Sequence, residues 1–189
     1  MIEVIENLEF ASILSYLYLQ NNLINSIPDL NLASLTKLYL DENAISFVSG
    51  LEACVKLEEL HVAKQRLPPD TSIEFDESSL IAISGSLKVL EISGNSITTL
   101  IPFSRLYSLR KIFAENNLIS DLSDIESIIS LHHLEEANFM HNPCCANKRY
   151  RDYAIGASAD GFLMLDGAPI LKHQQVIFSL LKLLVFILY

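Results

Sequence analysis

One short apolar pattern recurs along this chain and strongly limits how it can fold. The pattern has the form L-x-x-L-x-L-x-x-N-x-I-x-x-L or a close variant. Successive copies start 21, 22, 30, 22 and 25 residues apart. The six starting residues are Leu14, Leu35, Leu57, Leu87, Leu109 and Leu134. One unit of this size cannot bury its own apolar face, so the repetition predicts units that stack on one another.

This is the leucine-rich repeat pattern, in the class with roughly 20 to 29 residues per unit. The L-x-L pair predicts a short strand with both apolar side chains turned inward, because side chains alternate across a strand. The Asn that follows turns the chain, and we expect its amide to bond backbone groups of the neighbouring coil. The predicted ladder comprises Asn22, Asn43, Asn95, Asn117 and Asn142, with Gln65 as its irregular member.

We therefore expect an α/β fold, a leucine-rich repeat solenoid with a C-terminal cap. A curved parallel sheet forms the concave face, and helical or 3₁₀ turns form the convex face. Residues 1–143 are expected to hold the repeats, with six strands. Residues 144–175 are expected to form the cap, and residues 176–189 an apolar tail. Because Ile2, Ile5 and Leu8 match the back half of a unit, an N-terminally truncated array is expected.

The C-terminal prediction has two parts. A helix from about Lys148 to Ala157 would turn Tyr150, Tyr153 and Ala154 onto one face. The apolar residues expected to extend the sheet and seal the last leucines are Phe162, Leu163 and Leu165. The final 14 residues would span about 21 Å as a helix, which is short of a ~30 Å bilayer core. A membrane anchor is therefore disfavoured. Two interpretations of these 14 residues remain: they continue a capping helix, or they are a spurious coding end.

The unit that starts at Leu57 is about eight residues longer than its neighbours. We expect residues 68–84 to form a convex excursion that carries a helix, with Asp76 or Ser78 as N-cap and Gly85 near its end. The acidic residues of this stretch are Asp70, Glu74, Asp76 and Glu77. Two interpretations remain: a tolerated surface insertion or a partner-binding loop.

Composition and charge narrow the function classes. The net charge of −10 argues against nucleic acid as a partner, because phosphate binding needs clustered Lys and Arg. Three cysteines cannot form a disulfide framework, and the sequence has neither an Asn-x-Ser/Thr site nor a basic, apolar leader at its start. These observations favour the cytoplasm as location.

Residues with catalytic or metal-binding potential are few. The sequence has no phosphate-cradling glycine loop and no G-x-S-x-G elbow. His141 lies near Cys144 and Cys145, but adjacent cysteines lack the spacing of zinc ligands. His132 and His133 precede the sixth strand and are expected to be solvated. We therefore expect no enzyme, no cofactor and no metal site.

The concave face is the candidate binding site, and its residues follow from the alternation along each strand. Aromatic and acidic side chains dominate it, and five acidic residues against two basic ones leave it net negative by three. Aromatic anchors with charged neighbours are typical of protein-binding surfaces, although aromatic residues also favour strands in general. The candidate binding residues are Tyr16, Tyr18, Tyr39, Asp41, Glu59, His61, Glu91, Phe113 and Glu115.

The spacing of 21 and 22 residues, with the unit from Leu32 to Leu51, resembles the SDS22-like leucine-rich repeat family. The stretch "RYRDYAIGASADGFLMLDGAPI" is similar to that family's C-terminal cap. The resemblance implies a non-enzymatic regulatory subunit that binds the catalytic subunit of protein phosphatase 1, and association with microtubules and the centrosome region.

Alternatives to a phosphatase subunit remain. One is a microtubule, centrosome or axoneme adaptor without phosphatase contact, which would bind tubulin or centrosomal proteins. Another is a ribonucleoprotein-particle component with the same repeat and cap. Val176 to Phe178 has the V-x-F core of a phosphatase-docking motif, but Gln174 and Gln175 stand where Lys or Arg is expected. Any phosphatase contact is therefore expected on the concave face.

Overall fold

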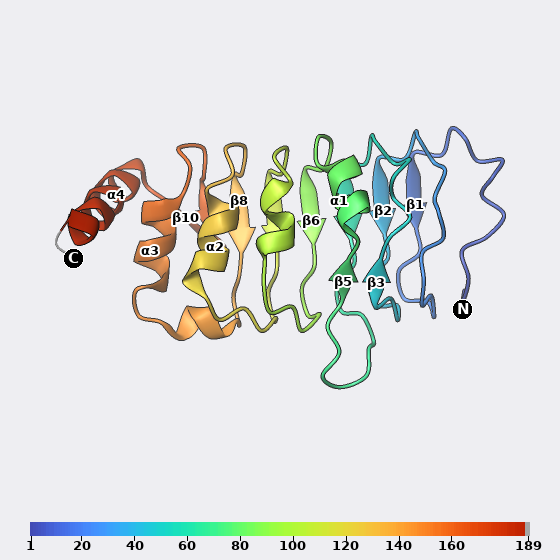
Figure 1. Ribbon diagram of the computed structural model, residues 1–189, viewed down its shortest axis with the longest axis horizontal. Helices are drawn as coiled ribbons and strands as arrows, with labels where there is room; N and C mark the ends of the chain where they lie inside the picture. Colours follow the sequence, from blue (N-terminus) through green and yellow to red (C-terminus); the bar gives the residue numbers. More distant parts are fainter. Residues whose placement is uncertain (188–189) are drawn as a thin grey trace.

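Seven parallel strands and one antiparallel strand form the main sheet of the computed structural model, which describes the backbone of residues 1–187 and side chains through residue 180. The repeat strands are β1 (Tyr16–Tyr18), β2 (Lys37–Tyr39), β4 (Glu59–His61), β6 (Val89–Glu91), β7 (Lys111–Phe113) and β8 (Glu136–Asn138). They pair in this order, side by side along the molecule (Figure 1). The predicted α/β leucine-rich repeat solenoid is confirmed.

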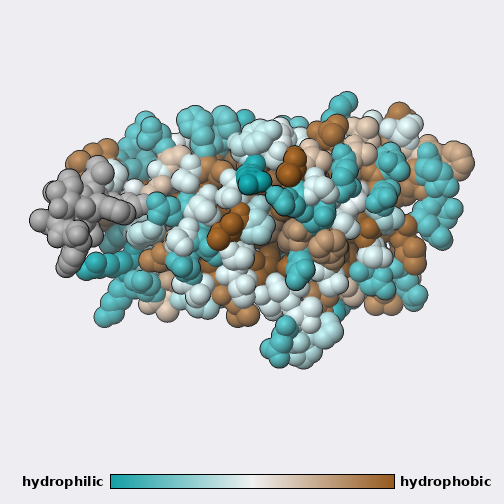
Figure 2. Space-filling model, in the orientation of Figure 1, coloured by the Kyte–Doolittle hydropathy of each residue, from teal (hydrophilic) through white to brown (hydrophobic). Residues whose placement is uncertain are grey.

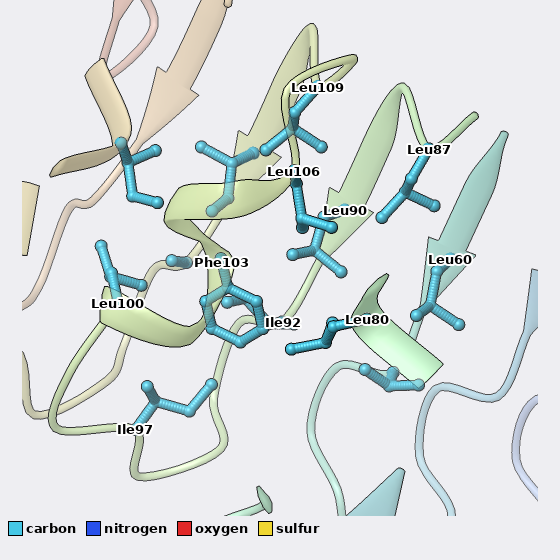
Figure 3. Packing of buried hydrophobic residues seen from close by; sticks show 14 of the residues in the cluster. Leu60, Leu80, Leu87, Leu90, Ile92, Ile97, Leu100, Phe103, Leu106 and Leu109 are labelled. Atoms are coloured by element: carbon cyan, nitrogen blue, oxygen red, sulfur yellow. The ribbon is translucent and has the colours of Figure 1, made fainter. Parts of the chain in front are cut away.

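The core lies between the sheet and the convex side. Each strand turns one side chain inward, and Leu38, Leu60 and Leu90 are 0% exposed. The convex segments close the core from the other side, as Figure 3 shows for Phe103, Leu100 and Leu80 beside the strand leucines. Burying a side chain of this size contributes about 1.5–3 kcal/mol, so stacking supplies the apolar burial that a single unit lacks.

The convex side carries short helices: α1 (Glu77–Ile83), the 3₁₀ turn η1 (Ile101–Arg105) and α2 (Leu122–Ile129). Helix α1 begins where the sequence predicts, because the Asp76 carboxylate accepts a hydrogen bond from the Ser79 backbone N–H at 2.9 Å. The loop that precedes α1 projects from the solenoid (Figure 1).

A second sheet on the convex side is a feature that the sequence prediction lacked. It pairs β3 (Phe47–Val48) with β5 (Glu74–Phe75) in parallel. The long unit therefore returns to the preceding coil and pairs with it before α1 begins. The excursion is thus anchored to the solenoid at its end, although its tip projects away.

The C-terminal segment contains the 3₁₀ turn η2 (Pro143–Ala146), α3 (Tyr150–Ala157), β9 (Met164–Leu165), β10 (Ala168–Pro169) and α4 (Lys172–Ile187). Strand β9 continues the parallel sheet beyond β8, and β10 pairs with β9 in antiparallel. Phe162 and Leu165 are buried and cover the last coil.

Three details differ from the sequence prediction. Helix α3 starts at Tyr150 rather than Lys148, and Tyr153 is only half-buried. Leu163 does not seal the core, because it is 54% exposed. Helix α4 extends on both sides of residue 176, and tail residues 188–189 lie outside the described part. Among the described residues, no helix has both the length and the apolarity to cross a bilayer.

Candidate protein-binding face

The strand register brings the predicted concave residues into columns. Tyr16 lies opposite Lys37, which lies opposite Glu59. In the central column, Tyr18, Tyr39 and His61 follow one another on adjacent strands. Neighbouring side chains in such a column are about 5 Å apart, so each one contacts the next.

The buried amide ladder ties the turn after each repeat strand to the backbone of the preceding coil. Asn43 is 0% exposed, and its side-chain N–H donates to the carbonyls of Leu19 and Leu40, both at 2.9 Å. Its side-chain oxygen accepts from the Ile24 N–H at 3.1 Å. The same pattern of bonds to the preceding coil recurs at Gln65, Asn95, Asn117 and Asn142.

A backbone feature accompanies every rung. The residue immediately before each ladder residue has a positive φ, a conformation that favours Gly and Asn. These residues are Asn21, Glu42, Lys64, Gly94, Asn116 and His141. His141 is therefore an exposed turn residue, and this role needs no metal.

Aromatic rings gather at the N-terminal end of the concave face. The Tyr18 and Tyr39 ring centroids are 4.8 Å apart, and the Tyr39 ring stacks on His61 at 4.0 Å with an interplanar angle of 17°. Tyr16 and Tyr18 are 55% and 57% exposed. The Lys37 ammonium lies 5.8 Å from the Tyr16 ring centroid. These side chains (Tyr16, Tyr18, Tyr39 and His61) are called the aromatic cluster below.

A polar network underneath fixes the orientation of the cluster. The Tyr39 hydroxyl donates to Glu59 Oε2 at 2.5 Å, and the Lys37 ammonium lies 2.8 Å from Glu59 Oε1. One carboxylate therefore holds both a ring and a cation of the neighbouring strand. A ring that is oriented before binding loses little conformational entropy when a partner covers it.

His61 has an uncommon environment within the cluster. Its Nε2 atom is buried and has no hydrogen-bond partner among the described residues. Burial lowers the pKa of His61, although the carboxylates of Asp41 and Glu59 oppose this shift. The side chain is therefore neutral near pH 7 and acts as a flat ring against Tyr39.

Acidic side chains follow the cluster along the face. Lys37 pairs with Glu59, and Lys111 pairs with Glu136 at 2.7 Å. Both lysines of the face are thus engaged by Glu59 and Glu136. The other three carboxylates of the face, Asp41, Glu91 and Glu115, take part in neither ion pair. Three unneutralised carboxylates give the face its negative potential.

Two of these carboxylates are partly desolvated. Burial raises the pKa of Asp41, which accepts from the Ala63 N–H at 2.7 Å. Burial likewise raises the pKa of Glu91, which accepts from the Ser93 N–H at 2.9 Å. Glu115 accepts from the Asn138 side-chain amide. A cation brought close to these groups would replace part of their lost hydration.

The predicted site residues do not all come together. Phe113 lies on β7, with Glu91 of β6 between it and His61 in the central column. The aromatic cluster and Phe113 are thus two separate apolar areas with an acidic stretch between them. The sequence prediction did not include Lys37 and Lys111 as partners of Glu59 and Glu136. Opposite charges at the same column position of neighbouring units are the signal that predicts such pairs.

The cysteine pair lies apart from this face. The Cys145 thiol donates to the Phe139 carbonyl at 3.1 Å, and a hydrogen bond from Cys144 lowers the pKa of Cys145. Within the described residues, no group of three His, Cys, Asp or Glu side chains is placed to hold a metal ion.

Comparison with known proteins supports the assignment of the fold. The Leucine Rich Repeat family model matches residues 86–104. The U2A′ complex with SNF from Drosophila melanogaster contains a chain that superposes with a TM-score of 0.59 at 19% identity, over 76% of this chain and 79% of that chain. An internalin from Listeria monocytogenes superposes with a TM-score of 0.58 at 18% identity, over 84% of this chain and 49% of that one.

This chain has the leucine-rich repeat fold. In sequence it is similar to human Cilia- and flagella-associated protein 410, with 35% identity over 66 residues. That match spans 35% of this chain and 26% of the human protein, so about a quarter of the relative's length is matched. The fold is one that serves as a protein-interaction scaffold, and the comparisons indicate no enzyme family.

Proposed function

We propose that this leucine-rich repeat protein is a non-enzymatic scaffold that binds a protein partner through its concave face. The observation that carries the proposal is the aromatic cluster. Tyr16 and Tyr18 expose more than half of their surface, while Tyr39 is held in place by Glu59 and by its stack on His61. Exposed aromatic side chains on a concave surface, beside a ring that is already oriented, are typical anchors of protein interfaces.

Charge indicates the kind of partner surface that would fit. The unneutralised Asp41, Glu91 and Glu115 follow the cluster along the face, and the whole chain carries a net charge of −10. A partner with basic residues beside an apolar patch would complement both features. Long-range attraction of this kind raises the association rate more than it raises the affinity.

The catalytic subunit of protein phosphatase 1 is the partner that we propose first. The stretch "ELHVAKQRLP", followed by Phe75-Asp76 and by "SLKVLEISGNSI", resembles protein phosphatase 1 regulatory subunit 42, the testis leucine-rich repeat protein. The resemblance includes Gln65 and the insertion that follows it, and the structure gives Gln65 a full set of ladder bonds. A regulatory subunit that acts in the cytoplasm is the corresponding role.

A second candidate is an adaptor of microtubules, the centrosome or the cilium without phosphatase contact. The similarity to Cilia- and flagella-associated protein 410 favours this candidate. Its partners would be tubulin or centrosomal proteins, and the same aromatic cluster would serve as the contact surface.

The test is surface-plasmon-resonance binding of the chain to the purified phosphatase catalytic subunit and, in parallel, to tubulin. Tyr39→Ala removes the ring at the centre of the cluster, and Tyr39→Phe is the matched control because it removes only the hydroxyl. The first candidate is supported if the chain binds the phosphatase and if Tyr39→Ala weakens that binding far more than Tyr39→Phe does. Binding to tubulin alone supports the second. If the chain binds either protein and Tyr39→Ala leaves the affinity unchanged, the concave-face assignment is contradicted.

A further inference from the structure

A groove runs along the amino edge of the main sheet, outside the concave face. Its volume is about 510 Å³, and every residue that lines it stands shortly before one of the strands β2, β4, β6, β7 and β8. Thr36 and Lys56 lie towards one end of the groove, and His133 lies at the other. The groove therefore crosses neighbouring coils of the solenoid, perpendicular to the strands.

The repeat register explains how the lining is built. The residues directly before the strands form one row, because the Lys88 N–H donates to the Glu58 carbonyl and the Arg110 N–H donates to the Lys88 carbonyl, both at 2.8 Å. Successive members of this row are about 4.8 Å apart. A second row lies two residues earlier in each coil, separated from the first by a buried leucine. It consists of Lys56, Ser86, Ser108 and His133.

Small residues in the middle of the second row make the surface hollow. Ser86 and Ser108 stand between the longer side chains of Lys56 and His133, and Gly85 precedes Ser86. The hydroxyls of Ser86 and Ser108 each donate to a backbone carbonyl, at 3.2 and 3.0 Å respectively. The floor of the groove is thus low and polar, and hydrogen bonds to the backbone hold it in place.

The charge of this groove is opposite to that of the whole chain. Lys56, Lys88 and Arg110 line it together with a single carboxylate, Glu58, although the chain carries a net charge of −10. We call it the basic groove below. Among the described residues, the exposed Lys56 takes part in no ion pair. Lys88 lies 2.6 Å from Glu58 and Arg110 lies 3.3 Å from Glu135, and both pairs are open to solvent.

These two ion pairs leave the cations available to a ligand. Exposed pairs contribute little to stability, so a second carboxylate can share or replace the first. An arginine has five N–H donors and an ammonium has three, which is more than one carboxylate uses. The basic groove therefore has three cations from three successive coils that can act on one anionic ligand.

We propose that the basic groove binds an extended, acidic segment of a partner protein. Carboxylates of the segment pair with Lys56, Lys88 and Arg110, and its backbone lies over the two serines. The distance from the coil of β4 to the coil of β8 is three strand spacings, or about 14 Å, which about four residues of extended chain span. The site goes beyond the concave face, whose negative potential selects a basic surface instead.

A second copy of this chain fits the basic groove less well than a partner does. Its most acidic exposed stretch surrounds the loop before α1, but three of the four carboxylates there are in regular elements or already engaged. Asp76 caps α1, Glu77 pairs with Arg105, and Glu74 lies in β5. That leaves Asp70, in a projecting loop that is coloured hydrophilic to neutral (Figure 2). One carboxylate matches three cations poorly, and two chains of net charge −10 repel each other.

The test is fluorescence anisotropy of the full chain with a labelled peptide of six glutamates, and the control peptide has six glutamines. We expect the glutamate peptide to bind at least about tenfold more tightly at about 50 mM salt. The difference should shrink at about 0.5 M salt, because the pairs are exposed and salt screens them.

Variants of the full chain locate the site. Lys56→Glu should weaken binding of the glutamate peptide at least about fivefold, whereas Glu58→Gln should strengthen it at least about twofold by releasing Lys88. Lys64→Glu is the matched control: it makes the same change in charge at the carboxyl edge of the sheet and should leave the affinity unchanged. It keeps the fold, because Glu42 adopts the same positive φ at the corresponding position of the preceding coil. Tyr39→Ala should also leave this affinity unchanged, so the result is independent of the concave face.

Any of four results overturns the proposal. The first is equal affinity for the two peptides, and the second is an equal loss for Lys56→Glu and Lys64→Glu, which would indicate an effect of net charge alone. The third is displacement of the peptide by inorganic phosphate but not by chloride at the same ionic strength, since the groove would then be a site for a small anion. The fourth is a dimer in light scattering that Lys56→Glu abolishes, since a second copy would then be the occupant.

Discussion

Replacing Asn95 by Ala tests whether the buried amide ladder stabilises the solenoid. Asn95 is 3% exposed and takes part in bonds to three backbone groups. Its side-chain N–H donates to the carbonyls of Val62 and Ile92, at 2.8 and 3.0 Å. Its side-chain oxygen accepts from the Gln65 N–H at 2.9 Å.

The expected magnitude follows from which of these groups would be left without a partner. The Val62 carbonyl also accepts from the Gln65 side chain, and the Ile92 carbonyl also accepts from Asn117. Only the Gln65 N–H loses its sole bond, and orphaning one buried donor costs about 1–3 kcal/mol. We therefore expect Asn95→Ala to lower the free energy of unfolding by about 2 kcal/mol.

The assay is urea denaturation followed by circular dichroism, with Asn22→Ala as the matched control. Asn22 also accepts from a backbone N–H of the preceding segment and donates to a carbonyl of its own coil, but it is half-exposed, so water can replace its amide. Its loss should cost less than about 0.5 kcal/mol. Equal effects of the two substitutions, or a parental midpoint for Asn95→Ala, would refute the ladder argument.

Three further predictions concern the concave face. Tyr39→Ala should weaken partner binding by about 1–3 kcal/mol through a faster off-rate, measured by surface plasmon resonance. Glu91→Gln should raise the free energy of unfolding near pH 7, because burial raises the pKa of Glu91 and so penalises its charged form; the gain should vanish below about pH 4.5, where the carboxyl is protonated in both states. The parent should lose stability as pH falls below about 6.5, because burial lowers the pKa of His61 and the unfolded chain takes up the proton first; His61→Phe should abolish this loss. Denaturation series at pH 7, 6, 5 and 4 measure both effects.

The strands and their register were predictable from the sequence because the repeat has a strict period. Each L-x-L pair specifies two inward positions, and the alternation along the strands is enough to place Tyr18, Tyr39 and His61 in one column. The helix start at Asp76 was predictable for a similar reason, since capping is a local interaction between an Asp and backbone N–H groups that follow it.

Features that depend on non-local side-chain packing were not predictable in this way. The β3–β5 pair joins two-residue strands from different units, and strands so short carry no periodic signal. The stack of Tyr39 on His61 depends on rotamers that Glu59 selects, and sequence spacing does not specify rotamers. Leu163 follows the apolar pattern yet lies exposed, because Phe162 and Leu165 already fill the end of the core.

The order in which the ends of the solenoid are synthesised has a consequence for folding in the cell. Phe162 and Leu165, which seal the last coil, leave the ribosome after all six repeat strands. Until then the newest coil has no downstream neighbour, and in a solenoid each unit draws its stability from its neighbours. We therefore expect the nascent chain to keep apolar surface exposed at the growing end of the array through most of its synthesis. Chaperone dependence should end abruptly once β9 has joined β8, rather than decline with each added repeat.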